Sequence, residues 1–424
     1  MEQTLFEDNP HWSDTKAYSH LATRQVLQKA ISYIETKHII ALVGARRVGK
    51  SSIAKLMIGE LLKGVEAKNI CFVNLEKPEF IPYKNDASYI GVIFDEYLKL
   101  ADPDRDKRIY LFLDEVQIFA NWEVFLKSKY ENSNIKFIIT GSNSSLLSSD
   151  LATVLSGRVL RLTITSFSFS EFLLYKGIDH ATKLQMVENR VAISRAKDEY
   201  LKWGGYFDVI STNSDMLRRD LLKNIVEDII LKDIVPRYSI KNSQQIRDLF
   251  YYVASNASSL LNYATLARKI GIDAKSIKEY IEYFEDNFLL YTIPAYHQKL
   301  ATQIRSTKKI YLSDTGFLNL GVKRSQNFGA MLENAVAIDL KRECEDLGYV
   351  KERLEVDFLC DDELLQVSYN IDDEKTRDRE LRAFSAFDPD KKYRHTLVTY
   401  DRSASRSTSL ESVLSYEEFA LLPR

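Results

Sequence analysis

The chain has 424 residues with 58 basic and 60 acidic side chains, so its formal net charge at pH 7 is −2. This length favours two or three domains, because a single hydrophobic core seldom serves so many residues. The balanced charge excludes a protein that coats nucleic acid over its whole surface, and it leaves a local basic patch for any such contact. Hydrophobic residues make up 45% of the sequence, which is ordinary for a globular protein and excludes long disorder.

The start of the chain and its cysteines indicate a cytoplasmic protein. The first residues are acidic and lack the apolar stretch of a secretory signal. No apolar run approaches the roughly 18 residues that a membrane helix needs, so we expect no membrane association. Cys71, Cys344 and Cys360 are odd in number and widely spaced, which predicts neither a metal-ligand pair nor a disulfide framework. We expect buried free thiols in a reducing compartment.

Short apolar runs alternate with helical stretches between about residues 30 and 165. The runs cover residues 38–43, 70–75, 108–113 and 135–140, and helices are expected over 49–62 and 89–100. Continuous apolar runs of strand length separated by helices are typical of a parallel sheet that is covered on both faces. The fold class is therefore α/β, with a nucleotide-binding layout in this part of the chain.

The second half of the chain has a different pattern. Residues 170–237 are mainly helical, and a turn interrupts them at 203–206. Three helices and two strand-like runs follow over 244–315, with Asp273 as the N-cap of the third helix. This order is the plan of a winged helix-turn-helix. A helix over 329–342 and a β-hairpin over 356–369 then predict a last α/β domain.

One segment matches the phosphate-loop pattern G-x-x-x-x-G-K-[ST], and it lies between an apolar run and a helix, as the motif requires. The glycines let successive backbone N–H groups point at a phosphate, and the start of the helix adds a favourable dipole. Lys50 would neutralise the β- and γ-phosphates, and the Ser51 hydroxyl would bind Mg²⁺. The predicted ATP-binding residues are Gly44, Ala45, Arg46, Arg47, Val48, Gly49, Lys50, Ser51 and Ser52.

The apolar run at 109–113 ends in Asp114 and Glu115. An aspartate at the carboxyl end of a buried strand can hold Mg²⁺, and a following glutamate can orient the water that attacks the γ-phosphate. The next run ends in Thr140 and Gly141, after which Ser142 or Asn143 would sense the γ-phosphate, with Ser142 preferred. Guanine-reading motifs are absent from the sequence, so adenine is favoured by elimination.

These motifs together resemble a family of prokaryotic AAA-type P-loop ATPases of the AAA+ superfamily, which carry a winged-helix segment and a C-terminal PD-(D/E)XK nuclease-like domain. Further segments that carry the resemblance are 155–158, 167–172, 204–206, 310–316, 332–334 and 355–358. The resemblance implies four parts: an ATPase core over 1–169, a helical lid over 170–240, a winged helix over 241–320 and a restriction-endonuclease-like α/β domain over 321–424.

The resemblance also suggests an arginine that completes the site of a neighbouring subunit in a homo-oligomer. Arg158 is the first candidate for this role and Arg161 the second. A winged helix can place a helix in the major groove of DNA. Its third helix carries Lys275 and Lys278 among several acids, which would partly repel phosphates, so Arg268 and Lys269 on the preceding helix are better placed.

The nuclease pattern of the family is incomplete in this sequence. It consists of an acid on a helix, an aspartate that opens a hairpin, and an acid-x-lysine on the second strand, where the acids hold a divalent metal. Glu333 and Asp357 match the first two positions, but Gln366 and Ser368 replace the acid and the lysine. A second metal site at Glu333, Asp357 and Gln366 would lack the charge that hard cations favour, so we expect little or no DNA cleavage.

The sequence therefore predicts an ATPase in which Lys50, Ser51, Asp114 and Glu115 bind and hydrolyse MgATP, with Ser142 and Arg158 assisting. Nucleotide state would rearrange the winged-helix and nuclease-like domains, in a process that acts on DNA or on a protein partner. Two alternatives are compatible with the same residues. One is an ATP-dependent DNA endonuclease, and the other is a regulator in which nucleotide binding alone stabilises a partner-binding conformation.

Overall fold

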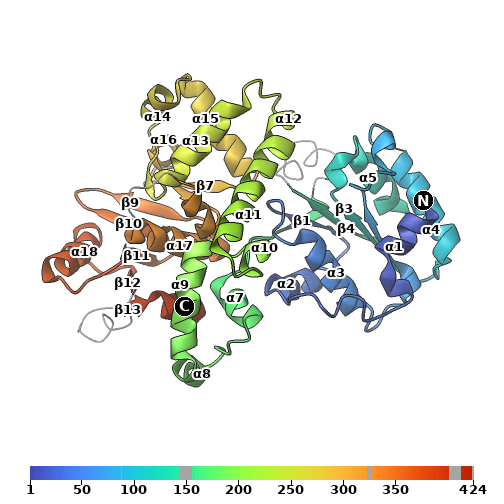
Figure 1. Cartoon of the computed structure of the whole chain (residues 1–424), viewed down its shortest axis with the longest axis horizontal. Helices are drawn as coiled ribbons and strands as arrows, with labels where there is room; N and C mark the ends of the chain where they lie inside the picture. Colours follow the sequence, from blue (N-terminus) through green and yellow to red (C-terminus); the bar gives the residue numbers. More distant parts are fainter. Residues whose placement is uncertain (87, 143–154, 156, 322–326, 401–411, 423–424) are drawn as a thin grey trace. The chain divides into compact units, whose positions relative to one another are not determined.

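A computed structural model describes residues 1–86, 88–142, 155, 157–321, 327–400 and 412–422 (Figure 1). The chain divides into two compact units, Met1–Thr165 and Ser166–Arg424, which we call unit 1 and unit 2. The segments predicted as lid, winged helix and nuclease-like domain all fall in unit 2. Within the described residues, no helix combines the length and the apolar character needed to cross a membrane.

Unit 1 is built on a parallel five-stranded sheet with the order β2-β3-β4-β1-β5. The chain runs from β1 past two strand positions to β2 and then returns through β3 to β4. Because parallel crossovers are right-handed, this reversal puts α3 on one face of the sheet and α4 and α5 on the other (Figure 1). The elements of unit 1 are α1 Glu2–Asp8, α2 Val26–Ser32, β1 Ile39–Val43, α3 Lys50–Leu61, β2 Ile70–Asn74, α4 Tyr89–Ala101, β3 Ile109–Asp114, α5 Trp122–Asn132, β4 Ile135–Gly141 and β5 Val159–Thr163.

The strands predicted from apolar runs are present because their side chains are buried on both faces. Every residue of β1 and β3 is buried, which confirms the α/β interpretation. Strand β5 was not expected. Its sequence places the exposed residues Arg161 and Thr163 on either side of the buried Leu162, so it lacks a continuous apolar run. It lies at the edge of the sheet, beside β1, where such a mixed strand is tolerated.

The N-terminal segment is anchored to β2 by buried polar side chains. The His11 Nε2 atom donates to the Ile70 carbonyl at 3.1 Å, and Nδ1 accepts from the Tyr18 hydroxyl at 3.1 Å. The Asn9 side chain both donates to and accepts from the backbone of Phe72, at 2.8 and 2.6 Å. Burial lowers the pKa of His11 to about 4, against a smaller opposing effect of the Ile70 carbonyl. This histidine is therefore neutral in the folded protein at pH 7.

Unit 2 contains two further sheets and most of the helices. Its helices are α7 Phe169–Tyr175, α8 Lys183–Glu188, α9 Arg190–Trp203, α10 Phe207–Ile210, α11 Asp215–Asp228, α12 Val235–Arg237, α13 Ser243–Ser255, α14 Tyr263–Ile270, α15 Ala274–Asp286, α16 Leu300–Arg305, α17 Phe328–Glu343, α18 Glu374–Phe387 and α19 Tyr416–Leu421. Its strands are β6 Ser259–Leu260, β7 Leu290–Pro294, β8 Lys308–Leu312, β9 Gly348–Lys351, β10 Glu355–Cys360, β11 Glu363–Ser368, β12 Arg394–Thr399 and β13 Ser412–Ser415. A π-helical stretch, Ile229–Ile234, joins α11 to α12.

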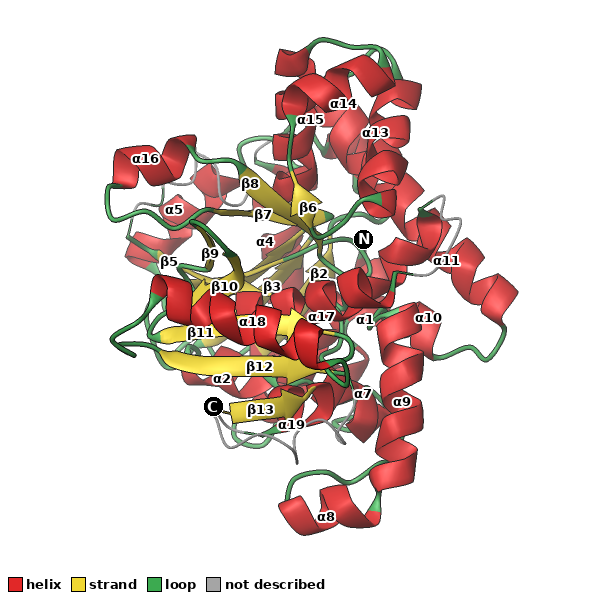
Figure 2. Cartoon of the chain, turned by 90° about the vertical axis from the view of Figure 1, so that its left-hand side faces the viewer, coloured by secondary structure: helices red, strands yellow, loops and turns green. Residues whose placement is uncertain are grey.

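The three-stranded sheet of unit 2 is antiparallel with the order β6-β8-β7. In the chain, β6 lies between α13 and α14, and β7 and β8 come after α15. The Asp273 side chain caps α15 by accepting from the Ser276 N–H, as predicted. The five-stranded sheet has the order β13-β12-β11-β10-β9, with the predicted hairpin formed by β10 and β11. Helix α18 lies across the face of this sheet that is turned to the viewer in Figure 2, and Val356, Leu364 and Phe384 share a buried cluster there.

A buried aspartate joins two of the segments that carry the family resemblance, 204–206 and 310–316, to the residue that precedes a third. Asp314, which follows β8, accepts hydrogen bonds from the Ser166 hydroxyl at 2.7 Å and from the Gly205 N–H at 2.9 Å. A Cβ atom on Gly205 would lie 2.2 Å from the Phe167 carbonyl oxygen. Burial raises the pKa of Asp314, while its hydrogen-bond donors lower it. These segments therefore pack against one another around Asp314.

The cysteines are buried free thiols, as expected, but two of them are not isolated. Cys344 at the end of α17 and Cys360 at the end of β10 lie together, with their sulfur atoms and an Asp361 carboxylate oxygen all within 4.8 Å of one another. Their wide spacing in the sequence did not predict this proximity, and the absence of a metal-ligand pair stays a prediction. Sequence spacing fails here because the α17–β10 packing, and not a local motif, brings the two thiols together.

We predict that His11 makes unit 1 sensitive to mild acid. Its pKa is about 4 when folded against an ordinary 6.5, so the unfolded state binds the proton first. Stability is therefore full above pH 6.5 and falls as the pH drops towards 4, by about 2 kcal/mol between pH 7.5 and 5. His11→Gln should flatten this pH dependence in urea unfolding followed by tryptophan fluorescence. The exposed His20, changed to Gln, is the control, and an unchanged slope in His11→Gln would refute the assignment.

Candidate functional site

The backbone between β1 and α3 forms a tight loop that requires glycine at both ends. Gly44 has a φ of +156°, and a Cβ atom there would lie 2.1 Å from the carbonyl oxygen of Ile164. Gly49 has a φ of +95° and is the N-cap of α3. Both values lie in the region that side-chain-bearing residues rarely adopt. The loop therefore curls back onto the start of α3, where free backbone N–H groups favour an anion.

Lys50 lies inside this loop and is 4% exposed. Its Nζ atom donates to the carbonyl oxygens of Gly44 and Ala45 at 3.1 and 3.0 Å. The Glu115 Oε1 atom lies 3.5 Å from the same Nζ. The ammonium group is thus held at the mouth of the loop between the backbone and a carboxylate. A buried cation in this position can attract a phosphate group strongly, because little water screens it.

The Asp114 carboxylate connects three elements of unit 1. The Ser51 hydroxyl at the start of α3 donates to its two oxygens at 3.0 and 2.8 Å. The Thr140 hydroxyl on β4 donates to Oδ1 at 2.6 Å. Burial raises the pKa of Asp114, and the hydrogen bonds from Thr140 and Ser51 counter this effect in part. Ser51 and Asp114 thus present oxygen ligands side by side, next to the loop, which is the donor chemistry that Mg²⁺ favours.

Glu115 and Ser142 lie at the same edge of the sheet and share a contact that the sequence did not suggest. The Gln117 amide donates to Glu115 Oε2 at 2.5 Å and to the Ser142 hydroxyl at 3.3 Å. The backbone N–H of Glu115 donates to the Thr140 hydroxyl at 2.9 Å. Gln117 therefore joins the predicted water-orienting acid to the predicted sensor. Asn143, the second sensor candidate, lies outside the described residues.

Arg24 is a further residue at the loop that sequence reasoning missed. It is 5% exposed and donates to the Val48 carbonyl of the loop at 3.1 Å. Its other terminal nitrogen donates to the carbonyl of Thr165, the last residue of unit 1, at 2.7 Å. No local motif surrounds Arg24, so the sequence gives no signal for this role. At the outer side of the loop, Arg46 forms an ion pair with Glu76 at 3.3 Å.

The structure does not bring Arg158 to the loop of its own chain. Arg158 precedes β5, and its carbonyl accepts from the N–H of Ile39, the first residue of β1. It therefore lies at the amino edge of the parallel sheet, whereas the phosphate loop follows the carboxyl edge. Its side chain forms an ion pair with Glu131 at 2.9 Å. A role for Arg158 or Arg161 in a neighbouring subunit stays a prediction.

Glu333, Asp357 and Gln366 come together in unit 2, from α17, β10 and β11, but a lysine lies among them. The Lys309 Nζ atom on β8 is 3.2 Å from Glu333 Oε1, 3.1 Å from Asp357 Oδ1 and 2.7 Å from Glu355 Oε1. We call these four charged residues the Lys309 cluster. Burial would lower the pKa of Lys309, but Asp357 and Glu333 raise it overall. Burial and the Asp357 charge raise the pKa of Glu333 to about 7.

The predicted DNA-contacting residues are exposed, but the lysines of α15 are paired with acidic residues of the same helix. On α15, Lys275 and Lys278 face Glu279 and Glu282 one helical turn later, at 3.8 and 3.7 Å. These pairs reduce the positive potential of that helix, as expected from its mixed charge. On α14, Arg268 and Lys269 are exposed, and Lys269 donates to the Tyr252 hydroxyl.

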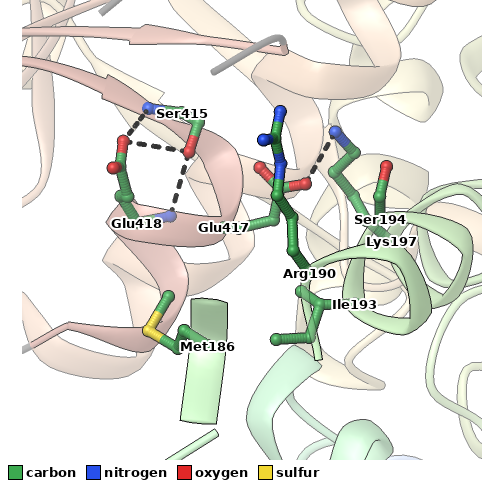
Figure 3. A pocket seen from close by; sticks show the side chains of 8 residues that line it. All are labelled: Met186, Arg190, Ile193, Ser194, Lys197, Ser415, Glu417 and Glu418. Carbon is green, nitrogen blue, oxygen red and sulfur yellow. Dashed lines mark hydrogen bonds and ion pairs between the residues drawn. The ribbon is translucent and has the colours of Figure 1, made fainter. Parts of the chain in front are cut away.

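A cavity in unit 2 is lined by residues of α8, α9 and the start of α19 (Figure 3). Lys197 pairs with Glu417 at 3.0 Å and donates to the Tyr400 carbonyl at 2.9 Å. Ser415 and Glu418 form a capping box at the start of α19. These polar groups bind one another, so the cavity is a packing junction between helices.

The phosphate loop, the strand order and the acid pair define an AAA-type P-loop ATPase domain, and comparison with known proteins agrees. Residues 36–173 match the family model described as an AAA domain. Residues 194–326 match a model described as a domain of unknown function (DUF8612). The second match crosses the boundary predicted between the lid and the winged helix. Unit 1 is thus a nucleotide-binding domain of the AAA class.

Two curated relatives cover most of the chain. It is 31% identical to the Uncharacterized protein MJ1544 of Methanocaldococcus jannaschii, over 82% of this chain and 78% of that protein. It is 28% identical to an Uncharacterized protein of Haemophilus influenzae, over 83% of this chain and 87% of the relative. The chain belongs to the family of MJ1544. Among solved structures, the Aeropyrum pernix Orc1 protein in complex with DNA has a TM-score of 0.32 at 11% identity, over 71% of this chain and 92% of Orc1.

We predict that Gly44→Ala abolishes nucleotide binding, because a Cβ atom at this position would lie 2.1 Å from the Ile164 carbonyl oxygen and would push the loop away from β5. Gly59→Ala in α3 is the matched control. A Cβ atom there meets nothing within 4 Å. It should leave binding unchanged and stabilise the helix by about 0.5–1 kcal/mol. Titration with a fluorescent ATP analogue measures binding, and equal affinities for the two variants would contradict the role of Gly44.

Proposed function

We propose that this protein binds ATP with Mg²⁺, hydrolyses it, and uses the nucleotide state to change how unit 2 is held. The observation that carries the proposal is the contact between Ser51 and Asp114 beside the buried Lys50. These groups supply a cation for the phosphates and oxygen ligands for a metal within one loop and one strand end. Such a combination has little structural use, because it concentrates buried charge that a bound ligand would neutralise.

Each residue has a distinct role in the proposed reaction. Ser51 and Asp114 would hold Mg²⁺, which supplies charge neutralisation to the phosphates when bound. Lys50 would exchange its contacts with backbone carbonyls for phosphate oxygens. Glu115 would orient the attacking water and accept its proton, and Gln117 holds one of its carboxylate oxygens in place. Ser142, linked to Glu115 through Gln117, would report the presence of the γ-phosphate.

The proposed coupling to unit 2 starts at Arg24. This side chain donates both to the phosphate loop and to Thr165, the residue that precedes unit 2. Gly44 also packs against Ile164, one residue earlier. A change in the loop on nucleotide binding or phosphate release would therefore act directly on the chain segment that leads into unit 2. Adenine remains the preferred base by elimination alone.

For unit 2 we propose a winged helix formed by α13, α14, α15 and the β6-β8-β7 sheet. Exposed Arg268 and Lys269 on α14 support contact with DNA phosphates, whereas the paired lysines of α15 do not. The alternative is that the winged helix binds a protein partner or a second copy of the chain instead of DNA. In a homo-oligomer, Arg158 would have the role of an arginine that acts on a neighbouring site.

Glu115→Gln should bind ATP with unchanged affinity but hydrolyse it at least ~100-fold more slowly, because the amide cannot accept a proton from water. The measurement is phosphate release at saturating MgATP, with binding followed separately by calorimetry. Full turnover in this variant would show that another group activates the water.

Lys50→Ala should weaken ATP binding by roughly 10- to 100-fold, which is the loss expected for a charge-assisted contact with phosphate. Lys63→Ala, at the exposed end of the loop that follows α3, is the control and should bind like the unchanged protein. If calorimetry gave Lys50→Ala and Lys63→Ala the same affinity for ATP, the assignment of the nucleotide site would be wrong.

DNA should stimulate phosphate release if the winged helix acts on nucleic acid. The assay compares single-stranded, duplex and branched DNA at low and moderate salt, since phosphate contacts weaken as salt rises. Arg268→Ala combined with Lys269→Ala should abolish the stimulation and leave basal hydrolysis intact. No stimulation by any of these substrates would select a protein partner instead.

A further inference from the structure

The family resemblance implies a divalent metal between Glu333, Asp357 and Gln366. The hydrogen bonds that these side chains form do not fit such a metal. The Asp357 Oδ1 atom accepts from Lys309 at 3.1 Å, and Oδ2 accepts from the Val367 N–H at 3.0 Å. The Glu333 Oε1 atom accepts from Lys309 at 3.2 Å and from the Tyr311 hydroxyl at 2.7 Å. The oxygens that a cation would share are thus already bound to N–H and O–H donors.

Gln366 is also committed to other contacts. Its side-chain oxygen accepts from the backbone N–H of Asp357 at 3.1 Å, and its amide donates to Glu380 Oε2 at 2.6 Å. A glutamate at position 366 would bring its carboxylate against that of Glu380, whereas glutamine converts this repulsion into a hydrogen bond. Ser368 donates to the Asn370 carbonyl at 3.2 Å. The side chains of Gln366 and Ser368 are therefore engaged in other hydrogen bonds and are not set up as ligands of a metal between Glu333 and Asp357.

Lys309 reaches the acids from a different sheet. It lies on β8, opposite Ile293 of β7, while Asp357 lies on β10 of the five-stranded sheet. The residue is 3% exposed, and its Nζ contacts three carboxylates. A divalent ion bound to the same oxygens would lie within a few ångströms of the ammonium group, and the two positive charges would repel each other in a site that water screens poorly.

We propose that the ammonium group of Lys309 takes the place of a divalent metal ion in this cluster, and that unit 2 therefore keeps nuclease-like acids as a metal-free structural centre. The cation is covalently part of β8, so it holds β8, α17 and β10 together at all metal concentrations. The acids are needed because a buried lysine without counter-charges is costly. They are not there to activate water for DNA cleavage.

The test is Mn²⁺ binding by nucleotide-free protein, followed by electron paramagnetic resonance. The unchanged protein should show no Mn²⁺ site that depends on Asp357. Lys309→Met should gain a single such site, because it exposes Glu333 and Asp357 to each other without a cation. Adding Asp357→Asn to Lys309→Met should remove the site again. Lys309→Arg, which keeps the positive charge, should gain none.

Thermal unfolding gives a second readout of the same substitution. Lys309→Met should melt at a lower temperature than the unchanged protein in EDTA, and Mn²⁺ should restore part of the loss. The melting temperature of nucleotide-free unchanged protein should be the same in EDTA and in Mn²⁺. If Lys309→Met does not fold, Lys309→Arg and the unchanged protein still decide the proposal by their Mn²⁺ binding.

Two results would overturn the proposal. The first is an Mn²⁺ site in the unchanged protein that Asp357→Asn abolishes. The second is Mn²⁺-dependent cleavage of plasmid DNA by the unchanged protein that is lost in Lys309→Met, since Lys309 would then be a catalytic lysine supplied by another strand. The proposed ATPase activity is tested independently of this proposal. Phosphate release would depend on Lys50 and Glu115, and it should be retained in Lys309→Arg.

Discussion

The proposed nucleotide site depends on the hydrogen bonds that the Asp114 carboxylate accepts. This carboxylate receives the hydroxyl of Ser51 from the start of α3 and that of Thr140 from β4, so one buried side chain sets the distance between three elements. Thr140 in turn receives the backbone N–H of Glu115, whose φ of 55° requires such support. Loss of this carboxylate would release α3 and the strand end that carries Glu115. In the reaction that we propose, binding and hydrolysis are therefore linked through a single residue.

The two acidic centres of the chain use similar residues to opposite effect. Around Asp114, both hydrogen-bond partners are neutral hydroxyls, so the negative charge remains available to a cation. Around Asp357, one carboxylate oxygen accepts from the ammonium group of Lys309, so that charge is already balanced. The electrostatic environment of an aspartate, and not its presence at a strand end, decides whether it can hold a metal. This contrast separates the proposed ATPase from the nuclease alternative.

Several motif segments of unit 2 have a packing role. Asn334, beside Glu333 on α17, is fully buried, and its side chain bonds both the N–H and the carbonyl of Leu312 on β8. Asp314 joins Ser166 and Gly205 in the same unit. Buried polar groups of this kind tolerate few replacements, because an unpaired partner would be left without water. A resemblance carried by these residues therefore reports a shared fold more directly than a shared reaction.

Local sequence was enough to predict the phosphate loop, strands β1 to β4 and the hairpin of β10 and β11. These features depend on local sterics and side-chain burial over a few consecutive residues, as at Gly44, Gly49 and Lys50. Packing between distant parts of each unit places β4 between β1 and β3, which lets Thr140 reach Asp114, and it brings Arg24 to the loop. It also brings Lys309 into contact with the acidic residues of unit 2, although Lys309 precedes its partner Asp357 by 48 residues in the sequence. Such contacts depend on how whole sheets and helices pack, and no short stretch of sequence encodes that packing.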